Sequence, residues 1–159
     1  MKHIELHRAG LTLRGLLTRP HDGSCPLVLM LHGFGASMDA SGGFFQDVSD
    51  RLTAAGFATL RLDFNGHGQS EGDFTEMTPF NEIEDAAALL RYAKSLDFVT
   101  DIHVLGHSQG GVVAGMLAGY YHDAVKSWRC WPRRPPSKRT RRRATVCGRT
   151  TTRNRSRTA

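Results

Sequence analysis

The chain has 159 residues, enough for one ordinary domain, and 40% of them are hydrophobic, which suits a globular core. The longest purely apolar run, residues 27–31, is far shorter than the roughly 18 residues of a membrane-spanning helix, so we expect no membrane protein. Three widely spaced cysteines without a CxxC pair argue against a disulfide framework and a zinc site. Because Met1 is followed by no apolar leader segment, the cytoplasm is the expected location.

The net charge of +6 conceals two dissimilar parts of the chain. Residues 1–126 hold nine Lys and Arg and all fifteen Asp and Glu, whereas residues 127–159 hold twelve Lys and Arg and no acid. The second part also lacks Leu, Ile, Phe and Met, so it cannot bury enough apolar area to offset its chain entropy. We therefore expect a partial domain over 1–126 and a basic, disordered, non-native tail over 127–159.

The first elements in chain order are strands. Residues 3–8 and 11–18 alternate polar and apolar side chains and predict an antiparallel pair. A continuous apolar run over 26–31 predicts a strand buried on both faces of a sheet. A helix is expected over 43–55 and a further strand over 58–63.

The following elements alternate helix and strand. Thr78 as an N-cap, followed by Pro79, predicts a helix to about residue 96. A strand over 102–105 and a helix over 112–121 complete the pattern. This alternation with short loops predicts an α/β fold, a mostly parallel sheet flanked by helices. The apolar positions expected on the buried face of the long helix are Phe80, Ile83, Ala87 and Leu90.

The strongest chemical signal is Gly-x-Ser-x-Gly at residues 106–110. It lies between a predicted strand and a predicted helix, where Ser108 would occupy the sharp turn of a nucleophile elbow. Gly106 and Gly110 are small enough to flank that turn. The helix N-terminus beside Ser108 favours developing negative charge. Ser108 is therefore the expected nucleophile.

A second signal, His-Gly-Phe-Gly at residues 32–35, directly follows the apolar strand. A tetrahedral intermediate needs two N–H donors, one after the nucleophile and one from an earlier strand-to-helix loop. The backbone N–H groups of Phe34 and Gln109 are the expected oxyanion hole. Structural roles are expected for three histidines, with His32 ordering the oxyanion loop, His67 ordering its own loop or forming a pocket wall, and His107 pointing into the scaffold.

Residues 63–72, 81–86 and 106–114 resemble bacterial cinnamoyl (feruloyl) esterases, which are α/β-hydrolases. The resemblance covers roughly residues 3–126, the N-terminal half of that fold. It implies hydrolysis of small hydroxycinnamate esters through an acyl-enzyme on Ser108, without cofactor or metal. Other α/β-hydrolase activities, namely a thioesterase, a lipase-like enzyme or a peptidase, stay open.

In this superfamily the acid and the histidine of the triad follow the serine along the chain. After Ser108 the sequence holds only His122 and Asp123 of the required types. Adjacent positions so soon after the nucleophile helix cannot present a histidine to Ser108 with an acid behind it. We therefore expect the triad acid and histidine to be absent from this chain, which would be a weak enzyme or an inactive one.

The basic tail allows two explanations. Arg139 and residues 141–143 form a dense basic patch, and Trp128 and Trp131 could stack on bases, as in a nucleic-acid-binding arm. The explanation we favour is a frameshift near the codon of Ser127. If the arginines use CGN codons, the shifted frame begins apolar-Ala-apolar-Leu-Ala, as a buried strand of the esterase family does at this point. The nucleotide sequence would test this hypothesis.

Overall fold

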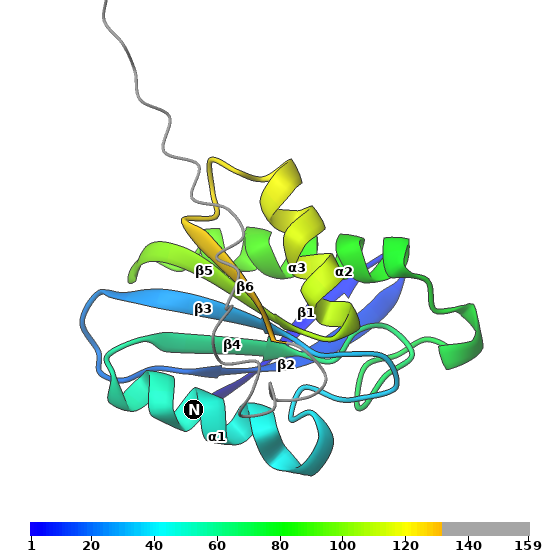
Figure 1. The fold of residues 1–159 in the computed structure, drawn as a ribbon, viewed down its shortest axis with the longest axis horizontal. Coiled ribbons are helices and arrows are strands. Elements are labelled where there is room, and N and C mark those ends of the chain that lie inside the picture. The colour runs from blue at the N-terminus through cyan, green and yellow to red at the C-terminus, as the bar shows by residue number, and fades with distance from the viewer. Residues whose placement is uncertain (132–159) are drawn as a thin grey trace, which may run out of the picture.

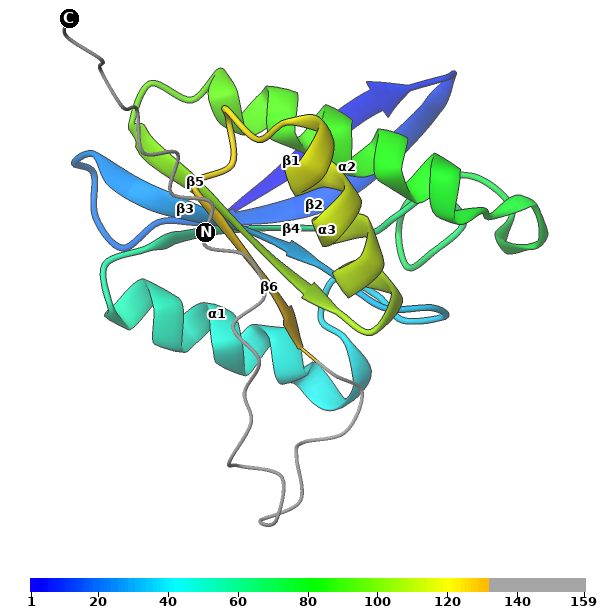
Figure 2. The same ribbon diagram turned by 45° about the horizontal axis from the view of Figure 1, so that its top comes forward.

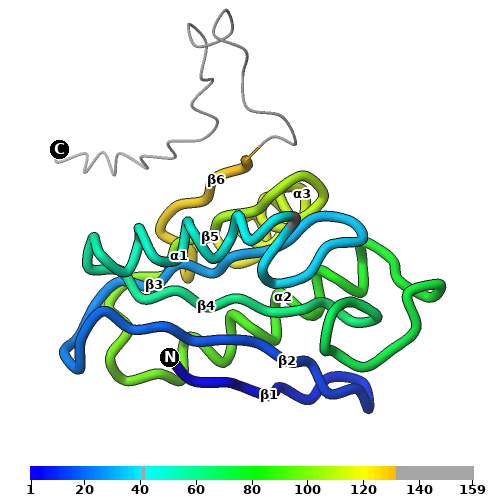
Figure 3. Tube along the Cα trace, turned by 90° about the horizontal axis from the view of Figure 1, so that it is seen from below, coloured from blue at the N-terminus to red at the C-terminus, as the bar shows by residue number. Residues whose placement is uncertain are grey.

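A computed structural model describes residues 1–131, which form a six-stranded sheet with helices on both faces (Figure 1). The strand order is β1-β2-β4-β3-β5-β6, and Figure 3 shows β1 and β6 at opposite edges of the sheet. The elements are β1 Lys2–Arg8, β2 Leu11–Thr18, β3 Cys25–Leu31, the 3₁₀ turn η1 Ser41–Gly43, α1 Phe44–Ala54, β4 Ala58–Leu62, the 3₁₀ turn η2 Phe74–Glu76, α2 Pro79–Lys94, β5 Val99–His107, α3 Gln109–Tyr120 and β6 Ser127–Trp131.

The two N-terminal strands form the expected antiparallel hairpin. Ala9 and Gly10 both have positive φ, at 49° and 81°, as a tight turn that follows the twist of the strands requires. β2 pairs antiparallel with β4, whereas β4, β3, β5 and β6 pair parallel to one another. The prediction of a mostly parallel sheet flanked by helices is therefore confirmed.

The helices divide between the two faces of the sheet, with α1 on one face and α2 and α3 on the other (Figure 2). β3 has β4 and β5 as neighbours and is covered on both faces, so nearly all of its side chains are buried. Leu27, Leu29 and Leu31 join the core under α2 and α3, whereas Val28 and Met30 pack with Phe45 of α1. This double burial explains the continuous apolar run of the strand.

The long helix α2 begins as predicted and buries a different face. The Thr78 side chain accepts a hydrogen bond from the Asn81 N–H, and Pro79 is the first helical residue. Phe80 was expected on the buried face, but it is 77% exposed, so that expectation is wrong. The reason is direction, because residues two positions apart on a helix point to nearly opposite sides, and Glu82 in the same first turn is buried. The buried side of α2 is made of Glu82, Asp85, Ala86, Ala87, Ala88, Leu89, Leu90 and Ala93.

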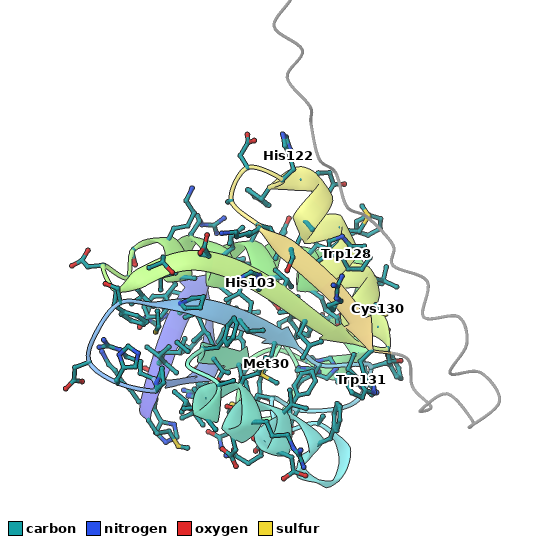
Figure 4. All side chains as sticks on the ribbon, turned by 60° about the vertical axis from the view of Figure 1, so that its left-hand side comes forward. Met30, His103, His122, Trp128, Cys130 and Trp131 are labelled. Atoms are coloured by element: carbon teal, nitrogen blue, oxygen red, sulfur yellow. The ribbon has the colours of Figure 1, made fainter. Side chains whose placement is uncertain are left out.

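The chain boundary expected between residues 126 and 127 is also corrected, because Ser127–Trp131 forms β6 beside β5. The strand persists because small residues of α3 leave room for its large side chains. The Trp128 ring lies over Gly115, and the Cys130 side chain lies over Gly111 (Figure 4). β5, the strand that leads to Ser108, is thus not an edge strand of the sheet. It would be one if the chain after residue 126 formed no strand.

The basic stretch from residue 132 onward lies outside the described residues. The predictions of a disordered tail, of a nucleic-acid-binding arm and of a frameshift therefore stay predictions there. Over residues 1–131, no helix is both long enough and apolar enough to cross a membrane.

Candidate functional site

The site lies where the parallel strands end, because the loops that follow β3, β4 and β5 meet at one edge of the sheet. In open α/β sheets this carboxyl edge is the usual place for ligands. The three loops carry the residues predicted for the site. They are the oxyanion loop (residues 32–43), the glycine-rich loop (residues 63–72) and the turn at Ser108 between β5 and α3.

Ser108 has φ 54° and ψ −118°, a conformation that is strained for any residue other than glycine. Its neighbours must be glycine, because a Cβ on Gly106 would lie 2.0 Å from the Gly110 carbonyl oxygen, and one on Gly110 would lie 2.2 Å from the Leu31 carbonyl oxygen. The helix begins at Gln109, three residues earlier than predicted. The structure therefore places Ser108 on a sharp strand-to-helix turn, which is the geometry predicted for a nucleophile elbow.

The oxyanion loop lies directly against this elbow. A Cβ built on Gly33 would approach the Ser108 Cβ to 3.1 Å, a tight contact that any larger residue could make only if the two loops shifted by a few tenths of an ångström. Within residues 1–131, the backbone N–H groups of Phe34 and Gln109 donate no hydrogen bond. Both predicted oxyanion donors are therefore free to bind a ligand and belong to adjoining loops.

His32 ties the oxyanion loop to the glycine-rich loop. Its Nδ1 lies 2.9 Å from the Gly33 carbonyl oxygen, and its Nε2 lies 3.1 Å from the Phe64 backbone N. A carbonyl only accepts and a backbone N–H only donates, so the ring is neutral with its proton on Nδ1. Burial, with a smaller contribution from nearby His67, lowers the pKa of His32 to about 4 against the opposing effect of the hydrogen bond to Gly33. The expected ordering role of His32 is thus what the geometry shows.

Asp63 and Arg61 of the β4 segment hold the same loop, and neither was predicted from the sequence. The buried Asp63 carboxylate accepts the N–H groups of Met38 and Gln69, and its burial raises its pKa above the usual value. The fully buried Arg61 donates to the Asp39 carboxylate. The sequence does hold signals that could have found both residues. Asp63 is an acid at the end of a predicted strand, and Arg61 is a cation inside an apolar strand.

Aromatic rings form a wall beside the two free amides. Phe34 is 63% exposed, and its ring centroid lies 5.3 Å from that of Phe74. Phe74 contacts His67 edge-on at 5.0 Å, and His67 in turn lies 5.0 Å from His32. The His67 Nδ1–H also donates to the Asn65 carbonyl, which orders the glycine-rich loop. An apolar group bound near Ser108 would meet this wall.

His122 and Asp123 do not reach the site. Both follow the C-terminus of α3, whose twelve residues separate them from Ser108 by about 18 Å. Their side chains are 75% and 94% exposed, and Figure 4 shows His122 at the far end of α3 from Trp131, whose carbonyl accepts the Ser108 N–H. The His107 ring lies against α1, with its centroid 5.9 Å from that of Phe44.

Residues 23–129 match the family profile described as serine aminopeptidase, S33. Among solved structures, the chain is similar to Est1E from Butyrivibrio proteoclasticus with ferulic acid bound, with 36% identity and a TM-score of 0.75. That match covers 79% of this chain and 50% of Est1E. A match to DcsB in complex with its substrate analogue has 26% identity and a TM-score of 0.73, over 82% of this chain and 45% of DcsB.

Two curated relatives match shorter segments. The quorum-quenching protein AidA of Acinetobacter baumannii is 33% identical over 89 residues, which are 54% of this chain and 28% of AidA. An uncharacterized 31.7 kDa protein of Escherichia coli is 30% identical over 88 residues, 54% of this chain and 30% of that protein. The chain thus spans less than a third of these relatives and about half of the solved structures. By its profile match over most of its length and by its fold, the chain belongs to the serine aminopeptidase S33 family of α/β-hydrolases.

Proposed function

We propose that Ser108 is the nucleophile of a carboxylic ester hydrolase whose substrates are hydroxycinnamate esters. The observation that carries the proposal is the strained Ser108 turn packed against Gly33, with the free N–H groups of Phe34 and Gln109 on adjoining loops. The substrate class is supported by the ferulic acid bound to Est1E and by the aromatic wall of Phe34 and Phe74.

The proposed reaction proceeds through an acyl-enzyme. The Ser108 hydroxyl oxygen attacks the ester carbonyl carbon while its proton passes to a base, and the carbonyl electron pair moves onto the oxygen. The N–H groups of Phe34 and Gln109 stabilise this oxyanion. When the carbonyl re-forms, the bond to the alkoxy oxygen breaks, and the alcohol leaves with the proton from the base. Water then attacks the acyl-Ser108 ester in the same way and releases the acid.

We infer that no residue of this chain supplies the base, because His122 and Asp123 are the only residues of the required types after Ser108, and they lie far from it. Oxyanion stabilisation and binding would then leave roughly 10³–10⁴-fold acceleration over the uncatalysed reaction. Acylation should be slow, and deacylation should be slow as well. With an activated ester such as p-nitrophenyl acetate, whose leaving group is far better than the serine alkoxide, acylation should be faster than deacylation, so the acyl-enzyme should accumulate and be detectable.

The test is acylation of the full 159-residue chain by p-nitrophenyl acetate, followed by intact-mass spectrometry and peptide mapping of the adduct. We expect one acetyl group on Ser108. Free imidazole should accelerate its formation, because the small molecule replaces the missing ring as base. Ser108→Ala should abolish this adduct, whereas Ser95→Ala, at an exposed serine at the end of α2, should leave it unchanged. An adduct that forms equally in Ser108→Ala would overturn the proposal.

The name of the family suggests a second candidate, an aminopeptidase. Methyl ferulate, methyl acetate and an aminoacyl p-nitroanilide would separate the two in the same assay. We expect the feruloyl adduct on Ser108 to form fastest relative to the uncatalysed reactivity of each compound. An adduct from the anilide alone would favour the peptidase and refute the esterase.

A further inference from the structure

The side chain of Gln109 makes a contact that the reaction proposed above does not use. Its Nε2 donates to the Glu82 carboxylate, with Nε2 and Oε2 2.7 Å apart, and lies 3.7 Å from the Met77 sulfur. Glu82 belongs to the first turn of α2, 27 residues earlier in the chain, and is fully buried. The contact therefore joins the N-terminus of α2 to the N-terminus of α3, directly beside Ser108.

A buried carboxyl at this position is costly for the fold. Burial raises the pKa of Glu82, the hydrogen bond from Gln109 and the nearby His67 oppose that rise, and the Asp85 carboxylate adds to it. The second carboxyl oxygen, Oε1, has no hydrogen-bond partner within residues 1–131. An apolar residue here would avoid these costs, so packing of α2 does not explain the glutamate. Ionisable groups kept under such conditions cluster at functional sites.

His67 presents a matching unpaired atom. The ring is 4% exposed, its Nδ1–H donates to the Asn65 carbonyl, and its Nε2 has no partner within the described part of the chain. Electrostatic interaction with His67 lowers the pKa of Glu82 and so opposes the effect of burial. A glutamine at position 82 would keep an acceptor for Gln109 and would also offer N–H donors to the His67 side.

The start of α3 has no other side-chain anchor within the described residues. Ser108 is its N-cap residue but makes no capping hydrogen bond through its side chain. Free N–H groups at a helix N-terminus are held in place only as firmly as the first turn is held. Since Gln109 is the first residue of α3, its side-chain bond to Glu82 restrains the backbone N–H that points at the proposed oxyanion.

We propose that Glu82 is a positioning residue for the oxyanion hole, which it orders by holding the side chain of Gln109. This inference rests on the proposed function for its effect on acylation, but the contact itself can be tested separately. Two variants remove the contact from opposite sides. Gln109→Leu keeps the backbone N–H and changes a half-buried side chain, and Glu82→Ala removes the buried acceptor.

The first measurement is hydrogen exchange of the Gly111 backbone amide, which donates to the Ser108 carbonyl in the first turn of α3, followed by NMR in the full chain. We expect exchange at residue 111 to become at least about tenfold faster in both variants, because loss of the Gln109 side-chain contact loosens this turn, while the core amides of β3 keep their protection. Glu82→Gln should retain the slow exchange of the parent. Glu84→Gln, at the exposed acid two residues further along α2, is the matched control and should change nothing.

The second measurement is the rate of Ser108 acylation by p-nitrophenyl acetate, extrapolated to saturation. Removing an oxyanion donor outright costs about 10²–10³-fold, so misplacing one should slow Gln109→Leu about tenfold. The double variant should be no slower than either single one, because both remove the same contact. Glu82→Gln should react within about twofold of the parent.

Parent-like exchange at residue 111 in folded Gln109→Leu would overturn the inference, whatever the activity. A Glu82→Gln variant that folds but exchanges as fast as Glu82→Ala would overturn it as well. If Glu82→Ala does not fold, Gln109→Leu and Glu82→Gln still decide. Absence of any Ser108 adduct in the parent chain would instead contradict the proposed function and leave the exchange result to decide the contact.

Discussion

Acid should destabilise this fold through His32, because the folded protein holds that ring neutral. An unfolded histidine takes up a proton near pH 6.5, whereas the pKa of His32 in the fold is about 4. Between these values the unfolded state binds more protons, so the free energy of unfolding falls as the pH drops. The full stability is present above about pH 6.5, and the difference between the two pKa values corresponds to about 3 kcal/mol lost by pH 4.

The assay is urea unfolding from about pH 7 down to about pH 4.5, comparing the parent with His32→Gln. A glutamine amide can donate to the Gly33 carbonyl and accept the Phe64 N–H, but it does not titrate. Asp63 and Glu82 have raised pKa values, so their contributions run the opposite way and are lost as the pH rises. Both proteins contain these acids, so the difference between the two curves isolates His32.

We expect the parent to lose up to about 1.4 kcal/mol per pH unit more than His32→Gln below pH 6.5. NMR titration of the His32 ring should report a pKa of about 4 directly. Equal pH dependence of the two proteins would refute the reasoning, and so would a ring that titrates near 6.5 in the folded state. Either result would mean that the ring accepts a proton where the structure buries it.

Three further predictions concern the framework of the site. Gly106→Ala should cost more than about 3 kcal/mol of stability, because its Cβ would lie 2.0 Å from a backbone carbonyl oxygen. Gly111→Ala should cost about 1–3 kcal/mol, because its Cβ meets the movable Cys130 side chain, with the sulfur at 2.3 Å. Urea midpoints would rank the two variants, and equal losses would contradict the prediction. Thr78→Ala should cost about 1 kcal/mol through loss of the α2 cap, measured by thermal unfolding, and no change would show that the cap is dispensable. Asp39→Ala leaves the buried Arg61 charge without its carboxylate and should cost about 3 kcal/mol of stability or more. Arg61→Met leaves Asp39, which is 56% exposed, in water and should cost less. The reverse order in urea unfolding would refute this prediction.

Much of the fold could be predicted because local patterns and core patterns agree. The continuous apolar run before His32 marks a strand covered on both faces, and β3 is covered in that way. Thr78 and Pro79 define the start of α2 through local chemistry alone. The spacing around Ser108, between a strand and a helix, predicts the elbow, because only glycine fits positions 106 and 110.

Prediction from the sequence failed where the outcome depends on distant neighbours. The composition of residues 127–159 as a whole predicts an unstructured segment, but over residues 127–131 β5 offers an open ladder of hydrogen bonds and the glycines of α3 accommodate Trp128 and Cys130. Phe80 fits a helical apolar period, yet it faces away from the side of α2 that buries Glu82 of the same turn. In both cases tertiary packing outweighs local composition.

By itself, then, the sequence determined the sharp turn that carries Ser108, because a strand, a glycine-flanked serine and a helix leave the chain little other local geometry. It also determined that one histidine and one acid follow Ser108. Only the tertiary structure decided which groups hold the site in place. Asp63, Arg61 and Glu82 act across 20 or more residues of chain, on Met38, Asp39 and Gln109. Such contacts arise where loops from different strands converge, and no local pattern encodes that convergence.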